Sequence, residues 1–352
     1  MTLQTVQALR LAFGVWVAAA IAYGVAWPLY FMLPLFTCMF LSLPIPWFGW
    51  KVATKLLYRL ALSLLLGLVI SEMFLPLPMV CIPLYGLLFF LIYYNDTPTA
   101  PPMAVMFMTL GITVVPIMGL EGSQGSHMIA IGFFLNMALG LVFTWLFHGL
   151  LPNSMAQSSL SVPLKKPTAP APPPKKERAR LALVSTLVAL SAVIFFFSLN
   201  LSQYALAMIY VCFMAGTPCT NASIVAMKGN ALATGIGGLA IVTAFNLLVA
   251  VPTYSFLLAV TLCFSFLFSQ QVFSGKPLAK AFGSGFITFL VLLGSSTGVD
   301  QVASTNFYLR IAQVLFAGLF CVTALMVVEH LLRPGRRKYR MFSLLRSFSS
   351  SQ

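Results

Sequence analysis

Few ionisable residues interrupt the apolar stretches of this chain, and those few are the residues that could do chemistry. Asp96 lies in residues 93–98 (YYNDTP), where proline and polar side chains break a helical pattern. A carboxylate at such a break can exchange protons, and free backbone groups there can bind a substrate. Asp96 is therefore a candidate for proton coupling, and Asn95 for substrate binding. The alternative is that Asp96 only caps the next helix.

Two histidines occupy matching positions in the two halves of the chain. His148 and His330 each stand four residues before a proline, and Glu329 adjoins His330. A histidine beside a carboxylate can relay protons near neutral pH, so all three residues are candidates for proton coupling. The alternative is that each histidine complements the dipole at a helix C-terminus.

Three basic residues could attract an anionic substrate. Lys51 and Lys228 stand at matching places in the two halves, and Arg59 follows Lys51 by about two helical turns. If they face an interface, they would bind carboxylates. The alternative is that their charged ends extend to lipid headgroups.

The pattern of reactive side chains argues against an enzyme. No nucleophile–base set or phosphate-binding loop is recognisable, and the six cysteines occur singly, without metal-ligand spacing. We therefore expect no cofactor and no metal.

The elements that must position these residues are membrane helices. Of the 352 residues, 60% are hydrophobic and 7% are charged, whereas about a quarter are charged in soluble proteins. Apolar runs long enough to cross a bilayer recur throughout, and they must be helical to satisfy their backbone hydrogen bonds. The runs predict about twelve transmembrane helices, at 8–26, 28–44, 52–74, 79–95, 100–120, 127–150, 180–199, 203–218, 226–250, 254–273, 278–295 and 307–332.

The distribution of positive charge predicts the topology. With both termini in the cytoplasm, every one of the 20 basic residues except Arg310 falls on the cytoplasmic side. The net charge of +14 is thus a topology signal and does not indicate nucleic-acid binding. We expect a multi-pass protein of the bacterial inner membrane, embedded in the lipid bilayer.

The chain is predicted to contain two like-oriented six-helix repeats that form a pseudo-dimer. Arg10 and Arg180 each begin the motif Arg-Leu-Ala, Pro101 stands at the start of the fifth predicted span, and Pro277 precedes the corresponding eleventh span. Six spans per repeat is an even number, so both repeats point the same way and meet at an interface. The predicted units are the first repeat at 1–152, a Pro/Lys-rich cytoplasmic linker at 153–178, the second repeat at 179–334 and a basic cytoplasmic tail at 335–352.

The chain resembles short members of the fusaric-acid-resistance and aromatic-acid-exporter superfamily (FUSC-like). The resemblance rests on the early Arg10 motif, Pro28 and Pro34 in the second span, the basic start of the third span, the break at 95–98 and the six-plus-six layout. It implies proton-driven efflux of small organic compounds, aromatic or other carboxylates, beside a periplasmic adaptor of the membrane-fusion type. The longer exporters have a cytoplasmic domain after each half, whereas only the linker at 153–178 and the tail at 335–352 are expected at these places here.

Other functions compete with efflux. The short outer loops also favour an adaptor, because another protein would have to carry substrate across the envelope. A major-facilitator transporter is disfavoured, because the loop at 44–51 has no acidic residue and no arginine pair. A passive organic-anion channel and a non-transporting structural subunit of an export complex remain alternatives, and a homo-oligomer is compatible with each.

Overall fold

The computed structural model describes residues 2–43, 49–96, 102–120, 122–153, 174–199, 208, 211–212, 220–276 and 278–296, together with residues 316, 320, 323, 324 and 327. Within this part of the chain, the protein is all-α, with ten α-helices. The first six are α1 Leu3–Gly24, α2 Met32–Leu41, α3 Trp50–Val69, α4 Pro78–Asp96, α5 Pro102–Gly119 and α6 Ser123–Leu150. A π-helical turn, η1 Ile70–Phe74, extends α3.

The second half contributes four described helices. They are α7 Lys175–Ser198, α9 Thr220–Ala250, α10 Tyr254–Val272 and α11 Ala279–Ser296. Ten of the predicted spans thus coincide with helices. The other two, 203–218 and 307–332, fall mostly outside the described residues.

Helix length and hydropathy make this a multi-pass membrane protein. Six described helices are long and apolar enough to cross a membrane: α1, α3 with η1, α4, α6, α7 and α10. Large apolar side chains such as Leu65, Met79 and Leu239 lie on the surface. Water would disfavour so much exposed apolar area, whereas lipid tails accept it.

Several element boundaries differ from the prediction, and two of these differences have a clear physical cause. The second span was predicted from residue 28, but α2 begins at Met32, because Ala26 and Leu29 take left-handed φ angles of 50° and 52° in a turn that contains Pro28. Residues 175–178 were assigned to the linker, but they form the first turn of α7, with Pro174 as its N-cap and Glu177 favourably placed at the positive end of the helix dipole.

All ten residues of α2 are buried. At 1.5 Å per residue the helix is about 15 Å long, too short to cross a hydrocarbon core alone. It packs against α1, α6 and α11, and so is enclosed by protein.

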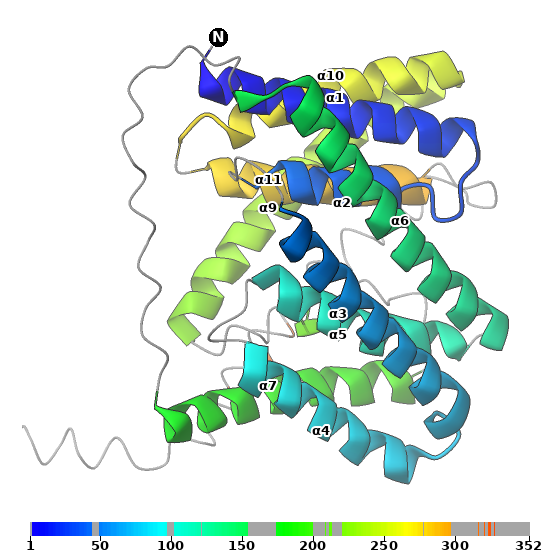
Figure 1. Cartoon of the computed structure of the whole chain (residues 1–352), viewed down its shortest axis with the longest axis vertical. Coiled ribbons are helices and arrows are strands. Elements are labelled where there is room, and N and C mark those ends of the chain that lie inside the picture. The colour runs from blue at the N-terminus through cyan, green and yellow to red at the C-terminus, as the bar shows by residue number, and fades with distance from the viewer. Residues whose placement is uncertain are drawn as a thin grey trace, which may run out of the picture.

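The helix ends fall on two sides of the molecule. We call the side on which α3, α7 and α11 begin the basic end, because exposed lysines gather there (Lys51, Lys55, Lys175, Lys176, Lys276 and Lys280). The N-terminus and the start of α7 both lie on the left in Figure 1, at this end. The opposite side is the outer end, named after the predicted topology.

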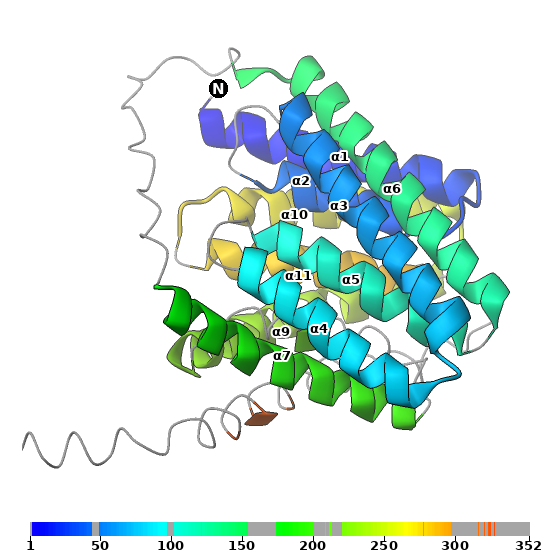
Figure 2. The same cartoon turned by 60° about the horizontal axis from the view of Figure 1, so that its bottom comes forward.

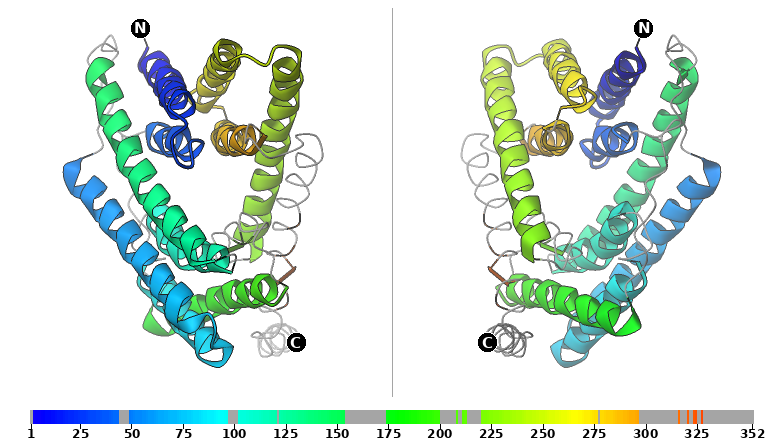
Figure 3. Two further views of the ribbon diagram at one scale, coloured as in Figure 1. Left: turned by 90° about the vertical axis from the view of Figure 1, so that its right-hand side faces the viewer. Right: turned by 90° about the vertical axis from the view of Figure 1, so that its left-hand side faces the viewer.

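Helices pack both within and between the two halves. Within halves, α3 lies against α5 and α9 against α11; between halves, α1 lies against α10, α4 against α7 and α2 against α11. Figure 2 shows α4 beside α7, and Figure 3 shows α1, α2, α10 and α11 as one group with α4 and α7 at the far side. The two halves therefore share an extensive interface.

Close helix crossings in both halves depend on glycine. A Cβ at Gly67 of α3 would collide with the backbone carbonyl of Gly111 in α5. A Cβ at Gly237 of α9 would collide in the same way with the carbonyl of Gly285 in α11. The sequence predicts close packing at Gly237 and Gly285, as in other small-residue helix faces, and the structure confirms it.

Candidate functional site between the two halves

The contact between α4 and α7, which we call the α4–α7 seam, contains a column of aromatic rings. Tyr85, Phe89 and Tyr93 stand four residues apart on α4, so they share one face, and their successive ring centroids are 5.8 and 6.0 Å apart. All three are almost completely buried. The hydroxyl of Tyr85 donates to the carbonyl of Ile112, and that of Tyr93 to the carbonyl of Cys212, which lies in the second half.

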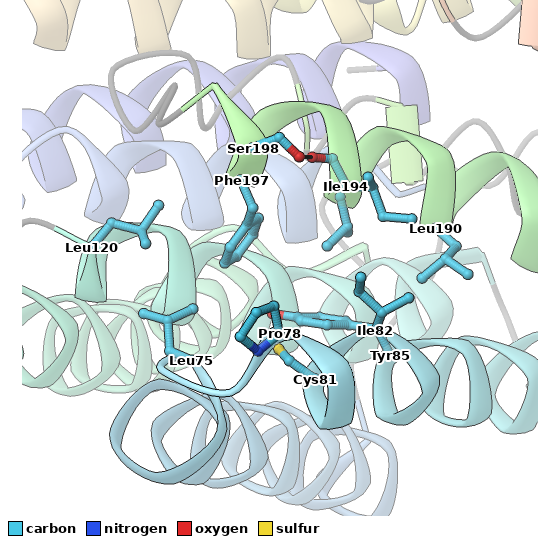
Figure 4. A pocket seen from close by; sticks show the side chains of 11 residues that line it. Leu75, Pro78, Cys81, Ile82, Tyr85, Leu120, Leu190, Ile194, Phe197 and Ser198 are labelled. Carbon is cyan, nitrogen blue, oxygen red and sulfur yellow. Dashed lines mark hydrogen bonds between the residues drawn. The ribbon is translucent and has the colours of Figure 1, made fainter.

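The outer end of this seam is hollow. A cavity of about 210 Å³ opens between the first turns of α4 and the last turns of α7. Figure 4 shows Cys81 and Tyr85 on one side of it and Leu190, Ile194 and Phe197 on the other. Its remaining lining is Leu75, Pro78, Ile82, Leu120, Val193 and Ser198. The cavity is almost entirely apolar, which suits the hydrocarbon part of a ligand.

The basic end of the same seam is closed by one arginine. Arg178, in the first turn of α7, donates from Nε to the carbonyl of Tyr94 at 2.6 Å and from Nη2 to that of Asn95 at 3.1 Å. Its guanidinium carbon also lies 4.7 Å from the centre of the Tyr94 ring. A cation at a helix C-terminus meets carbonyls without intrahelical partners, so Arg178 joins the two halves at this point.

The contact between α1 and α10, the α1–α10 seam, is closed at the outer end. The hydroxyl of Tyr254, at the start of α10, donates to the carbonyl of Ala20, and this side chain also covers Gly24. One turn further along, Trp16 Nε1 donates to the carbonyl of Leu258 at 3.0 Å. These bonds fix the outer half of α1 to α10.

The basic end of the α1–α10 seam is hollow. A cavity of about 320 Å³ lies between the first two turns of α1 and the end of α10. Its lining is mixed: amides and hydroxyls (Thr2, Gln4, Thr5, Gln270 and Ser274) together with apolar and aromatic side chains (Ala8, Leu9, Phe266 and Phe273). The two seams between the halves are therefore hollow at opposite ends.

A second buried arginine tethers α1 to α6. Arg10 is only 3% exposed, and it donates from Nε and Nη2 to the carbonyl of Leu151 and from Nη2 to Oδ1 of Asn153. His148 is also buried in the last turn of α6, and its Nδ1 lies 2.8 Å from the carbonyl of Thr144. Both side chains thus contact the C-terminal turns of α6 or the residues after it.

The structure brings some predicted site residues to the seam. Asn95 and Asp96 end α4 at the basic end of the α4–α7 seam, and the carbonyl of Asn95 accepts from Arg178. The side chain of Asp96 lies outside the described residues. Its role in proton coupling stays a prediction, and its backbone position places it at a helix end.

The other predicted site residues are not gathered there. Lys51 is exposed and Arg59 half-buried on α3, which packs mainly against α5 and α6 of its own half. The backbone of Lys228 lies in α9, but its side chain lies outside the described residues, as do Glu329 and His330 altogether.

Sequence reasoning missed two parts of the seam. The aromatic spacing of Tyr85, Phe89 and Tyr93 was visible and could have indicated a buried stripe. Arg178 was counted only as a topology signal. Its partner could not be deduced, because the pairing of α4 with α7 joins residues more than 80 positions apart.

Comparison with known proteins gives one family match. Residues 7–147 match the family described as "Protein of unknown function (DUF2955)", so the match covers α1 to α5 and most of α6. No curated protein and no solved structure matches the chain. The matched stretch is thus similar to a family without an assigned activity, and it ends three residues before α6 does.

Proposed function

We propose that this protein is an inner-membrane efflux transporter that exports small organic compounds, namely aromatic or other carboxylates. The resemblance to FUSC-like exporters suggested this class, and a proton gradient is the proposed driving force. A periplasmic adaptor would continue the route outward.

The proposal rests on the cavities and the polar contacts at the ends of the two seams. Each joins one half to the other, each is hollow at one end, and each is closed at the opposite end by a polar side chain, Arg178 or Tyr254. A transporter that alternates access needs an interface that can open on one side while it is closed on the other. An ordinary structural interface would be packed closely along its whole length and has no need of a cavity at one end.

Two like-oriented repeats would supply such an interface. In support, the crossing of Gly67 with Gly111 has a counterpart 170–174 residues later, in Gly237 with Gly285. The contact of α1 with α10 likewise has its counterpart in that of α7 with α4. The family match also ends close to the predicted end of the first repeat.

The test is flux through purified protein in liposomes. Radiolabelled benzoate and salicylate would be followed with and without an imposed proton gradient, with empty liposomes as the control for passive leakage. Ile194→Trp fills the outer cavity and should lower flux about tenfold, the effect of about 1.4 kcal/mol. The matched control is Leu187→Trp on the same helix, because Leu187 and Ile194 are 38% and 39% exposed but only Ile194 lines the cavity.

The outcomes separate the competing functions. Gradient-dependent flux that only Ile194→Trp impairs supports the proposal. Flux that ignores the gradient would favour a passive organic-anion channel. An absence of flux in well-folded protein would favour a non-transporting subunit of an export complex.

A further inference from the structure

The cavity at the basic end of the α1–α10 seam has a counterpart that is filled. The offset of 170 residues that aligns Arg10 with Arg180 also aligns Ala8 with Arg178. Both residues stand in the first turns of their helices, and both face the last turns of the partner helix from the other half. Where Arg178 closes the α4–α7 seam, the methyl group of Ala8 leaves a space of about 320 Å³.

At the outer ends of the two seams, the α1–α10 seam is the closed one and the α4–α7 seam is the hollow one. Tyr254 closes the α1–α10 seam by covering Gly24 and donating to the carbonyl of Ala20. The corresponding end of the α4–α7 seam holds the apolar cavity beside Ile194. Each seam thus has a large polar side chain at one end and a cavity at the other, and the two seams have them at opposite ends.

We propose that the cavity at the basic end of the α1–α10 seam is the loading site for the transported organic anion, and that the α4–α7 seam serves its release. This inference rests on the proposed function, because it assigns separate places to uptake and release. It makes the two halves unequal partners, with Ala8 as the residue that keeps the loading site open.

The lining fits a small organic anion. The side-chain amides of Gln4 and Gln270 supply N–H donors for a carboxylate, while the rings of Phe266 and Phe273 offer an apolar surface to the remainder. Lys276 stands two residues after Ser274 in the sequence and is exposed, so its positive charge would raise the local concentration of anions. The cavity is large enough for a small aromatic acid, since ligand pockets begin at about 300 Å³.

Binding to the purified full-length protein in detergent tests the assignment without relying on flux. The probe is radiolabelled benzoate in equilibrium dialysis, with uncharged benzyl alcohol as the competitor that lacks a carboxylate. We expect saturable benzoate binding that benzyl alcohol displaces poorly. Ala8→Met fills the cavity without adding charge and should weaken binding about tenfold or more. The control, Gln7→Met, changes the neighbouring residue, which does not line the cavity.

A second variant keeps the assignment testable if Ala8→Met does not fold. Gln270 is exposed, so the variant Gln270→Leu should fold. The substitution removes one amide N–H donor from the cavity and should therefore also weaken benzoate binding. Unchanged binding in both Ala8→Met and Gln270→Leu, or an absence of saturable binding to the native protein, would overturn the assignment. Binding and flux are measured separately, so the two hypotheses can fail separately. Flux in a protein that does not bind benzoate at this cavity would contradict only the assignment of the loading site. Benzoate binding in a protein without flux would contradict the proposed transport.

Discussion

At the scale of single residues, Arg10 and Arg178 show how positive charges are accommodated near the membrane. Arg10 binds the backbone after α6, and Arg178 binds the end of α4. Both donate to carbonyls at helix C-termini, which lack intrahelical partners and carry partial negative charge. Removing an arginine from water is costly unless such partners are present. Each arginine is therefore a point where one helix is tied to another.

Asp96 is a single residue whose proposed role in proton coupling depends on the binding and release of one proton. It follows Asn95, whose carbonyl accepts from Arg178. Asp96→Asn keeps the size of the side chain but cannot exchange a proton, so we expect normal insertion and folding with loss of gradient-driven export. Flux in liposomes and size-exclusion profiles would measure the two effects.

The control for Asp96 is Glu177→Gln, which neutralises an exposed acidic residue at the same end of the molecule. It should leave export unchanged. If Asp96→Asn exports as well as the native protein, Asp96 has no part in proton coupling.

At the scale of elements, hydropathy predicted the helices well and their partners poorly. Ten predicted spans match α-helices because a run of apolar residues in lipid has to be helical. The start of α2 was wrong because the left-handed residues Ala26 and Leu29 are not distinguishable in a hydropathy pattern. The start of α7 was wrong because charged residues 175–178 look like linker, although they form a helical turn.

The candidate site was predictable only in part. The break after α4 directed attention to Asn95 and Asp96, which do lie at a seam between the halves. The cavities and Arg178 could not be predicted, because they arise from which helices pack together. Apolar periodicity carries no information about partners when the helices are apolar nearly all round.

The helix crossings give a prediction at this scale. Gly237→Val should sharply lower the yield of folded protein, because any Cβ at this position meets the backbone of α11, which cannot move aside as a side chain can. Expression followed by size-exclusion chromatography in detergent would measure the folded fraction.

Gly235→Val is the matched control for Gly237. It lies on the same helix, but a Cβ there would have nothing within 4 Å. Both variants change glycine to valine within α9 and so change the helix propensity equally. The difference between their folded yields therefore measures the effect of the close crossing of α9 and α11. Equal yields would show that the close approach of α9 and α11 is not required for folding.

At the scale of the whole molecule, we propose a pseudo-dimer whose two seams are not equivalent. The α1–α10 seam is hollow at the basic end, and the α4–α7 seam is hollow at the outer end. A duplication followed by divergence at Ala8 and Arg178 would turn one symmetric interface into a loading side and a release side. All of this requires that both halves cross the bilayer in the same direction.

Cysteine labelling in intact cells tests that orientation most directly. Single cysteines would replace Glu72, Thr253, Lys175 or Lys276 in a protein whose native cysteines have been replaced, and a membrane-impermeant maleimide would label them. All four positions are exposed. The account predicts that Glu72 and Thr253, at the outer ends of the two halves, are labelled from outside, and that Lys175 and Lys276 react only after the cells are opened. Labelling of Glu72 and Thr253 from opposite sides of the membrane would contradict it.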